Sequence, residues 1–171
     1  TLTYRVAWLL DHGTDPWNIL LLTFTNKAAR EMTERVRSLI PLDLSRLWSG
    51  TFHSIANRIL RQHAEYLGYT PAFTIMDSDD RKSMIKSVVK SLKLDEKSTR
   101  FPKPEVLSSL FSLADNEGAN IRETQENAYP YLSNHLDAIL EVHDQYVARK
   151  QETNSMDFDD LLLNVVRLFQ E

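Results

Sequence analysis

The chain has 171 residues, 42% of them hydrophobic and 26% charged, a composition typical of a soluble globular domain or of one domain with an insertion. It has no cysteine, which excludes a disulfide framework, a cysteine nucleophile and cysteine-ligated metals and favours a cytoplasmic location. No apolar run approaches the ~18 residues of a membrane helix, so we expect no membrane partner. Because the chain opens on Thr1 inside a helical pattern, we expect a fragment of a longer protein.

The net charge of −4 argues against a protein that coats nucleic acid by bulk charge. The charges are nevertheless unevenly distributed. Residues 26–61 contain seven basic and three acidic residues, residues 81–103 contain eight and two, and residues 115–160 contain three and eleven. Two basic stretches therefore precede an acidic one, and local contacts with phosphates stay compatible with the composition.

Apolar spacing from Leu2 to Leu10 predicts a short helix that ends at Gly13. The continuous apolar run Ile19–Leu22 then predicts a strand. Since no polar residue alternates within this run, we expect the strand to be buried on both faces, as in a parallel sheet covered by helices.

The corner after this strand is the first candidate site. A helix is predicted from about residue 26 to 40, capped by Thr25 or Asn26, and ligands of open α/β sheets gather where such helices follow strand ends. An aromatic ring accepts base stacking, while hydroxyl, amide and ammonium groups hold phosphates. The corner therefore suits single-stranded nucleic acid, and the alternative is that its ring closes the core at the strand end. The candidate residues are Phe24, Thr25, Asn26 and Lys27.

The strand, corner and helix pattern recurs once. Residues 47–52 predict a second strand, and residues 53–67 predict an amphipathic helix that ends at Gly68. In a parallel sheet the two corners would share one edge and form a continuous rim. No catalytic residue is assigned, because adjacent side chains such as His53 and Ser54 do not face each other on a helix. The candidates at the second corner are Thr51, Phe52, His53 and Ser54, with Arg58 on the helix behind them.

Beyond Gly68 the strand signals stop and every further predicted element is a helix. The helices are expected at residues 79–92, 104–116, 133–152 and 157–170, with turn-like or polar linkers at 93–103 and 117–130. Lys82, Lys86 and Lys90 line one face of the first of these helices. This face is either simply solvated or a contact for duplex phosphates.

Neither a metal site nor a nucleotide site is predicted within this chain. Asp157, Asp159 and Asp160 resemble a carboxylate cluster for Mg²⁺, but they open a helix, and acidic residues there are favoured by capping and by the helix dipole. We therefore interpret them as a cap. With four glycines in all, no glycine-rich phosphate loop can be written, so no cofactor-binding residue is assigned.

Two segments resemble motifs of superfamily 1 DNA helicases of the UvrD, PcrA and Rep type. Ile19 to Arg37, which contains LLLTFTNKAAREMTERVR, resembles motif Ia, and Ser49 to Leu60, SGTFHSIANRIL, resembles motif Ib. The similarity continues, in family order, through FTIMDSDD from Phe73, LKLDEK from Leu92 and MDFDDLL from Met156.

The resemblance implies an α/β, mostly helical fold: part of a RecA-like (P-loop NTPase) parallel sheet at residues 1–68, with an all-helical insertion subdomain at residues 69–171. It implies that both corners lie along the path of single-stranded DNA and that the insertion faces duplex DNA. The parent would be an ATP-dependent 3′–5′ DNA helicase of repair or replication that uses ATP and Mg²⁺. The fragment, which lacks the Walker motifs, is expected to bind neither and to be inactive. The alternative is a stand-alone, non-enzymatic module for binding nucleic acid or protein.

Overall fold

The protein, seen in a computed structural model that describes residues 1–94 and 101–170, forms two compact units. The first unit is Thr1–Ile59, and the second begins at Leu60, so the boundary falls within helix α3. Each unit has its own cluster of buried apolar side chains. Among the described residues, no helix is long and apolar enough to cross a membrane. The centre of the predicted linker at 93–103 lies outside the described residues.

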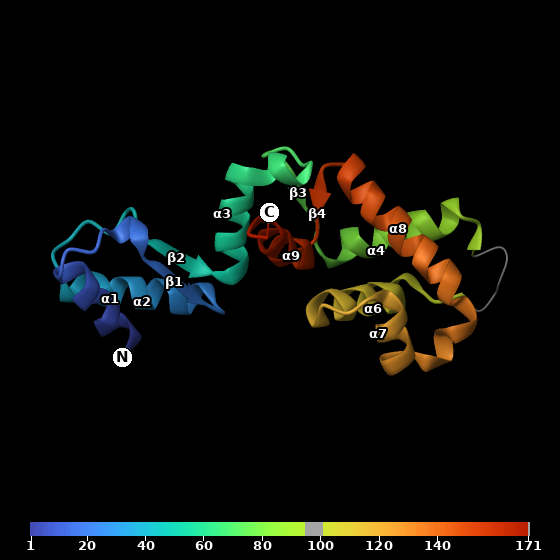
Figure 1. Ribbon diagram of the computed structural model, residues 1–171, viewed down its shortest axis with the longest axis horizontal. Helices are drawn as coiled ribbons and strands as arrows, with labels where there is room; N and C mark the ends of the chain where they lie inside the picture. Colours follow the sequence, from blue (N-terminus) through green and yellow to red (C-terminus); the bar gives the residue numbers. More distant parts are fainter. Residues whose placement is uncertain (95–100, 171) are drawn as a thin grey trace. The chain divides into compact units, whose positions relative to one another are not determined.

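The first unit is built on two parallel strands that lie side by side with helix α2 packed along them (Figure 1). The strands pair in register from Leu20 opposite Trp48 to Thr23 opposite Thr51, which confirms the predicted parallel arrangement. The elements of this unit are α1 (Leu2–Asp11), the 3-10 helix η1 (Pro16–Asn18), β1 (Leu20–Thr23), α2 (Asn26–Leu39), β2 (Trp48–Thr51) and the start of α3 (Phe52–His63).

The prediction that the first strand is buried on both faces is wrong. Successive side chains of a strand point to opposite faces, and Leu21 is only 2% exposed, within the core shared with α1 and α2, whereas Leu20 is 54% exposed. On the face of Leu20 the described residues leave a pocket of about 280 Å³, walled by Trp48 and Ile55 among others. A continuous apolar run therefore does not by itself establish burial on both sides.

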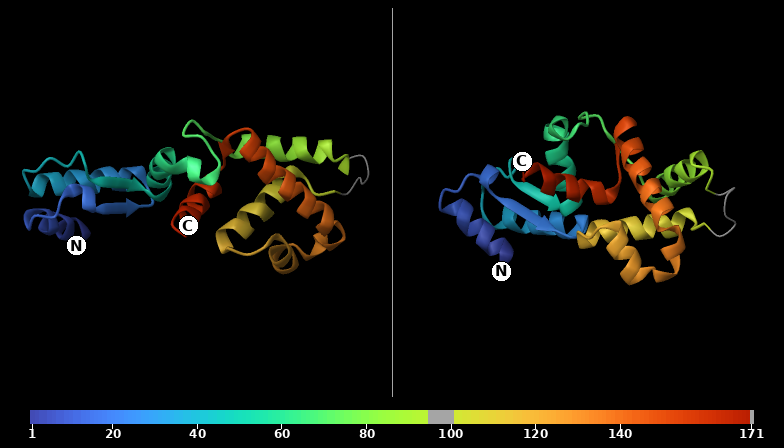
Figure 2. Two further views of the ribbon diagram at one scale, coloured as in Figure 1. Left: turned by 45° about the horizontal axis from the view of Figure 1, so that its top comes forward. Right: turned by 45° about the vertical axis from the view of Figure 1, so that its right-hand side comes forward.

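The second unit is mostly helical, and Figure 2 shows its helices from two further directions. Its core gathers apolar side chains from α4, α6 and α8, with Phe111, Ile139 and Tyr146 almost fully buried. The elements that follow α3 are η2 (Ala64–Leu67), β3 (Thr74–Ile75), α4 (Ser78–Ser91), α6 (Pro104–Glu117), α7 (Ile121–Ala128), η3 (Pro130–His135), α8 (Leu136–Glu152), β4 (Ser155–Met156) and α9 (Phe158–Leu168).

Two expectations for the second unit are corrected. It is not all-helical, because β3 and β4 pair in parallel, with Thr74 opposite Ser155. Strands of two residues show no periodicity, so sequence patterns miss them. The polar stretch 117–130 also contains a helix, α7, whose N-cap Asn120 accepts a hydrogen bond from the amide of Glu123. The inner face of α7 is mainly polar, which hides the usual apolar stripe.

A network of buried charges connects α4, α8 and the start of α9. Lys150, which is 3% exposed, donates hydrogen bonds to Asp157 at 3.0 Å and to Asp160 at 2.7 Å. Tyr146 also donates to Asp157. Arg81, 7% exposed, pairs with Asp159 and lies 3.8 Å from Asp157. Burial disfavours the charged form of Asp157, but the charges of Lys150 and Arg81 outweigh it and lower the pKa of Asp157 to about 2.

Candidate nucleic-acid interface

The two predicted corners lie together at the carboxyl edge of the β1–β2 pair. Since the strands are parallel and Thr23 is opposite Thr51, Phe24 and Phe52 both leave the sheet at the same edge. We call the residues of both corners, Phe24–Lys27 and Thr51–Ser54, the strand-end edge. The sequence prediction that the two corners meet at one edge is confirmed.

Two phenyl rings stand out from this edge. The rings of Phe24 and Phe52 have centroids 5.3 Å apart and are tilted by 43°, within the range of favourable aromatic pairs. Phe24 is 89% exposed and Phe52 is 40% exposed. Of the two alternatives for Phe24, packing at the end of the core therefore does not match the structure, which leaves the faces of its ring accessible.

The first corner is held by a helix cap. Thr25 has extended backbone angles, and its hydroxyl accepts a hydrogen bond from the amide of Ala28 at 3.1 Å, which begins α2. Asn26 and Lys27 are exposed on the first turn, and Lys27 forms a 3.9 Å surface pair with Glu31. An amide, an ammonium group and the free N–H groups of a helix N-terminus are thus available beside Phe24.

The second corner is held by two hydrogen bonds that Ser54 donates to Thr51. The amide of Ser54 donates to the Thr51 hydroxyl at 3.2 Å, and the Ser54 hydroxyl donates to the Thr51 carbonyl at 2.9 Å. A Cβ at Gly50 would lie 2.5 Å from the Ser54 hydroxyl oxygen, so a larger residue there would displace this hydroxyl. His53 is half-buried next to these residues. The hydroxyls of Thr51 and Ser54 therefore fix the corner that presents Phe52.

Arg58 is placed apart from the other candidates. Its guanidinium carbon lies 3.9 Å from the centre of the Trp48 ring, a cation–π contact. Trp48 is the first residue of β2, whereas Thr51 is the last, so Arg58 lies at the far end of the strand from the corner. The structure thus brings together eight of the nine residues predicted for single-strand contact and separates Arg58 from them.

The lysines predicted for duplex contact lie on α4 in the second unit. Lys86 and Lys90 are exposed, and the opposite face of the helix buries Ile85, Val88 and Val89. Lys82 is half-buried, and its Nζ lies 3.0 Å from Asp79 Oδ1. Two of the three lysines are therefore open to a partner.

The acidic residues at the start of α9 serve as a cap. The carboxylate of Asp157 accepts from the amide of Asp160, and the carboxylate of Asp160 accepts from the amide of Asp157, a reciprocal capping box. The interpretation as a helix cap is confirmed for Asp157 and Asp160, whereas the carboxylate of Asp159 pairs with Arg81.

A family model for the UvrD/REP helicase N-terminal domain matches residues 1–171, the full length of the chain. The chain belongs to this family. It is 38% identical over 170 residues to the ATP-dependent DNA helicase PcrA of Staphylococcus aureus and 39% identical over 170 residues to PcrA of Staphylococcus epidermidis. These alignments cover 99% of the chain but 22% of each relative, so the chain spans about a fifth of their length.

The relatives are named as ATP-dependent helicases, which implies an ATP-binding site in those proteins. The residues of this chain do not fit such a site. Its four glycines lie far apart and form no phosphate loop. The carboxylates of Asp157 and Asp160, which resemble metal ligands in sequence, are already engaged by Lys150 and by the cap. We therefore assign no step of ATP hydrolysis to these residues.

Proposed function

We propose that this chain is part of an ATP-dependent DNA helicase. Residues 1–68 would belong to a first motor domain, in which β1 and β2 are two strands of a RecA-like sheet, and residues 69–171 would form an insertion. The family membership and the helicase names of the relatives support this proposal. The motif resemblance adds movement in the 3′ to 5′ direction on single strands, with duplex unwinding in repair or replication. ATP and Mg²⁺ would be held by other parts of the full-length protein.

Within that motor the strand-end edge would hold single-stranded DNA. The observation that carries this assignment is the exposed pair of Phe24 and Phe52 at one edge, since aromatic rings provide platforms on which successive bases stack. Lys27, Asn26 and the amides at the start of α2 follow Phe24 directly in the chain, and they would hold the backbone phosphates. Stacking does not depend on base identity, so binding of this kind tolerates any sequence.

Replacement of Phe24 by alanine tests this assignment. Because its ring is 89% exposed, we expect the midpoint of thermal unfolding to change little. Loss of one stacking platform should weaken binding of a fluorescent oligothymidylate by about 1 to 3 kcal/mol at fixed salt. Phe169→Ala serves as a control, since this ring is 75% exposed but belongs to the second unit. Equal affinities of wild type and Phe24→Ala would refute the platform.

The exposed lysines of α4 would contact the phosphates of duplex DNA. Charge reversal by Lys86→Glu and Lys90→Glu should weaken duplex binding about equally for all sequences. It should also lower the slope of log affinity against log salt by about 0.9 for each phosphate that the variant no longer neutralises. Lys82→Glu should have a smaller effect, because Lys82 already pairs with Asp79. A salt slope identical to that of the wild type would mean that this face of α4 is only solvated.

A further inference from the structure

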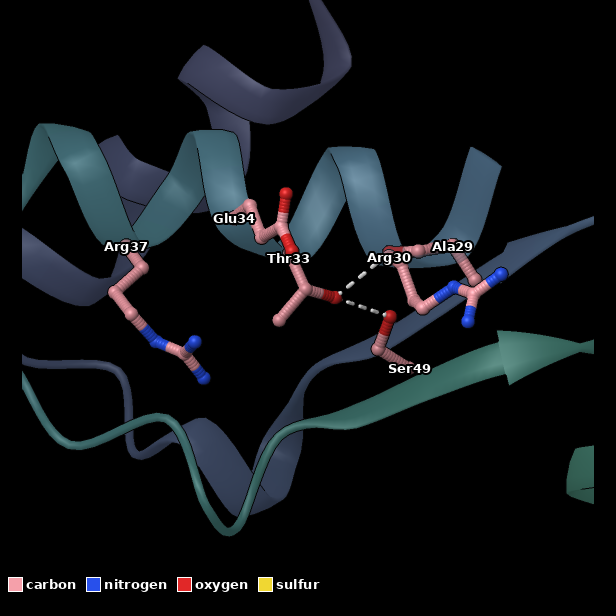
Figure 3. Close-up of a pocket in the computed structure, with 6 residues that line it drawn as sticks. All are labelled: Ala29, Arg30, Thr33, Glu34, Arg37 and Ser49. Carbon is pink, nitrogen blue, oxygen red and sulfur yellow. Dashed lines mark hydrogen bonds between the residues drawn. The ribbon is translucent and has the colours of Figure 1, made fainter. Parts of the chain in front are cut away.

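A second polar feature of the first unit lies between α2 and β2. Figure 3 shows a pocket in which Arg30 and Arg37 of α2 lie on either side of Thr33 and of Ser49 from β2. The pocket has a volume of about 220 Å³, and Ala29 and Glu34 complete its lining. We call these six residues the α2–β2 groove.

The hydroxyl groups of the groove have no proton left to donate. Thr33 Oγ1 donates its single proton to the carbonyl of Ala29 at 2.9 Å. The 2.8 Å bond between Thr33 and Ser49 must therefore be donated by Ser49. The side-chain donors of the groove are then the two guanidinium groups, so a ligand would be recognised mainly by its negative charge.

Both guanidinium groups are exposed, and in the described part of the chain neither forms an ion pair within 4.0 Å. Arg30 and Arg37 are seven residues apart, which places them on one side of α2 and roughly 10 Å apart along its axis. This spacing spans more than one phosphate of a nucleic-acid strand, in which each phosphate advances by about 3.4 Å in the stacked form. Glu34 carries the one negative charge of the lining and leaves it with a net charge of +1.

The groove continues from the strand-end edge. Lys27 lies one turn before Arg30 on the same side of α2, so Lys27, Arg30 and Arg37 form a basic row that starts at the corner beside Phe24. We infer that the α2–β2 groove binds the backbone phosphates of the same DNA strand that stacks on Phe24, and so extends the bound length of that strand along α2. This inference rests on the proposed function of the strand-end edge.

Oligothymidylates of increasing length separate the groove from the edge. With this chain, Arg30→Gln and Arg37→Gln together should leave the affinity for the shortest bound oligonucleotide unchanged. Longer oligonucleotides should bind the wild type about three- to tenfold more tightly than the shortest one, because they reach two further exposed charge contacts. The double variant should lose this gain. The salt slope for the long oligonucleotide should fall by about 0.7 for each phosphate that is no longer neutralised. Glu34→Gln should have the opposite effect and strengthen binding of the long oligonucleotide.

Arg35→Gln is the matched control, because Arg35 is an exposed arginine on the opposite side of α2. If Arg35→Gln weakens long-oligonucleotide binding as much as the groove variants do, the effect is general charge and the inference is wrong. If the groove variants bind long oligonucleotides as tightly as the wild type, while Phe24→Ala still binds short ones more weakly, the inference about the groove is wrong but the proposed role of the strand-end edge stands. If Phe24→Ala binds oligothymidylates as tightly as the wild type while the groove variants bind the long ones more weakly, the proposed role of the strand-end edge is wrong. Failure of the wild type to bind any length would overturn both.

Discussion

Replacing Lys150 by methionine is expected to lower the free energy of unfolding by about 3 to 5 kcal/mol, because it removes one partner of a buried ion pair. Lys150 is 3% exposed and is the cation that bonds both Asp157 and Asp160. Methionine fills similar space but leaves two carboxylates without this partner. Arg81, 3.8 Å from Asp157, offsets only part of the loss. Urea unfolding followed by circular dichroism measures the change.

Lys86→Met provides the matched control for this experiment. Lys86 is an exposed lysine of the same unit, so its replacement should change stability by less than about 0.5 kcal/mol. If Lys150→Met lowers the free energy of unfolding by less than about 1 kcal/mol, the result contradicts a buried network of charges. It would mean that water reaches the two carboxylates in the folded protein.

Asp115→Asn is expected to stabilise the protein increasingly as the pH rises from 4 to 7. Burial raises the pKa of Asp115 from 3.8 to about 6, and the nearby positive charge of Lys150 offsets only part of this shift. The folded state therefore binds a proton between these pH values that the unfolded state has released. The stability that this proton provides is fully present below pH 3.8 and is lost as the pH rises through about 6. The total loss in the free energy of unfolding is about 3 kcal/mol. Asparagine does not ionise and avoids this loss.

The comparison of the two proteins at each pH isolates Asp115. His143 lines the same pocket of about 380 Å³, and burial lowers its pKa, so its own contribution makes the protein more stable as the pH rises. That contribution is present in both proteins and cancels in the difference. Urea midpoints at pH 4, 5, 6 and 7 give the difference directly. A difference that stays constant over this range would show that Asp115 ionises in the folded protein as it does in the unfolded one.

The parts of the fold that the sequence predicts are those in which one local signal is strong. The polar corner after Leu22 combines an apolar run, a capping threonine and a helical stripe, and the structure has a strand, a cap at Thr25 and a helix there. The pairing of the two corners follows because parallel strands end at one edge. Asp157 was predictable as a cap from its position before an apolar helix.

The features that the sequence does not predict depend on residues far apart in the chain. The pairing of Thr74 with Ser155 spans about half of the chain and shows no periodicity. Arg58 is on the predicted helix, but its side chain lies over the ring of Trp48, at the other end of β2 from the corner. The α2–β2 groove depends on Ser49 facing α2. The seven-residue spacing of Arg30 and Arg37 places both on one side of α2, but this spacing alone does not reveal the groove.

Photo-cross-linking tests most directly whether the strand-end edge holds single-stranded DNA. An oligothymidylate carrying 5-iodouracil would be bound to the chain, irradiated and digested with trypsin, and the modified peptides sequenced by mass spectrometry. Cleavage after lysine and arginine places Phe24 in the peptide Val6–Lys27 and Phe52 in the peptide Leu47–Arg58. We predict adducts on Phe24 or Phe52 that an unlabelled oligothymidylate competes away. Competable adducts confined to residues outside these two peptides would contradict the assignment.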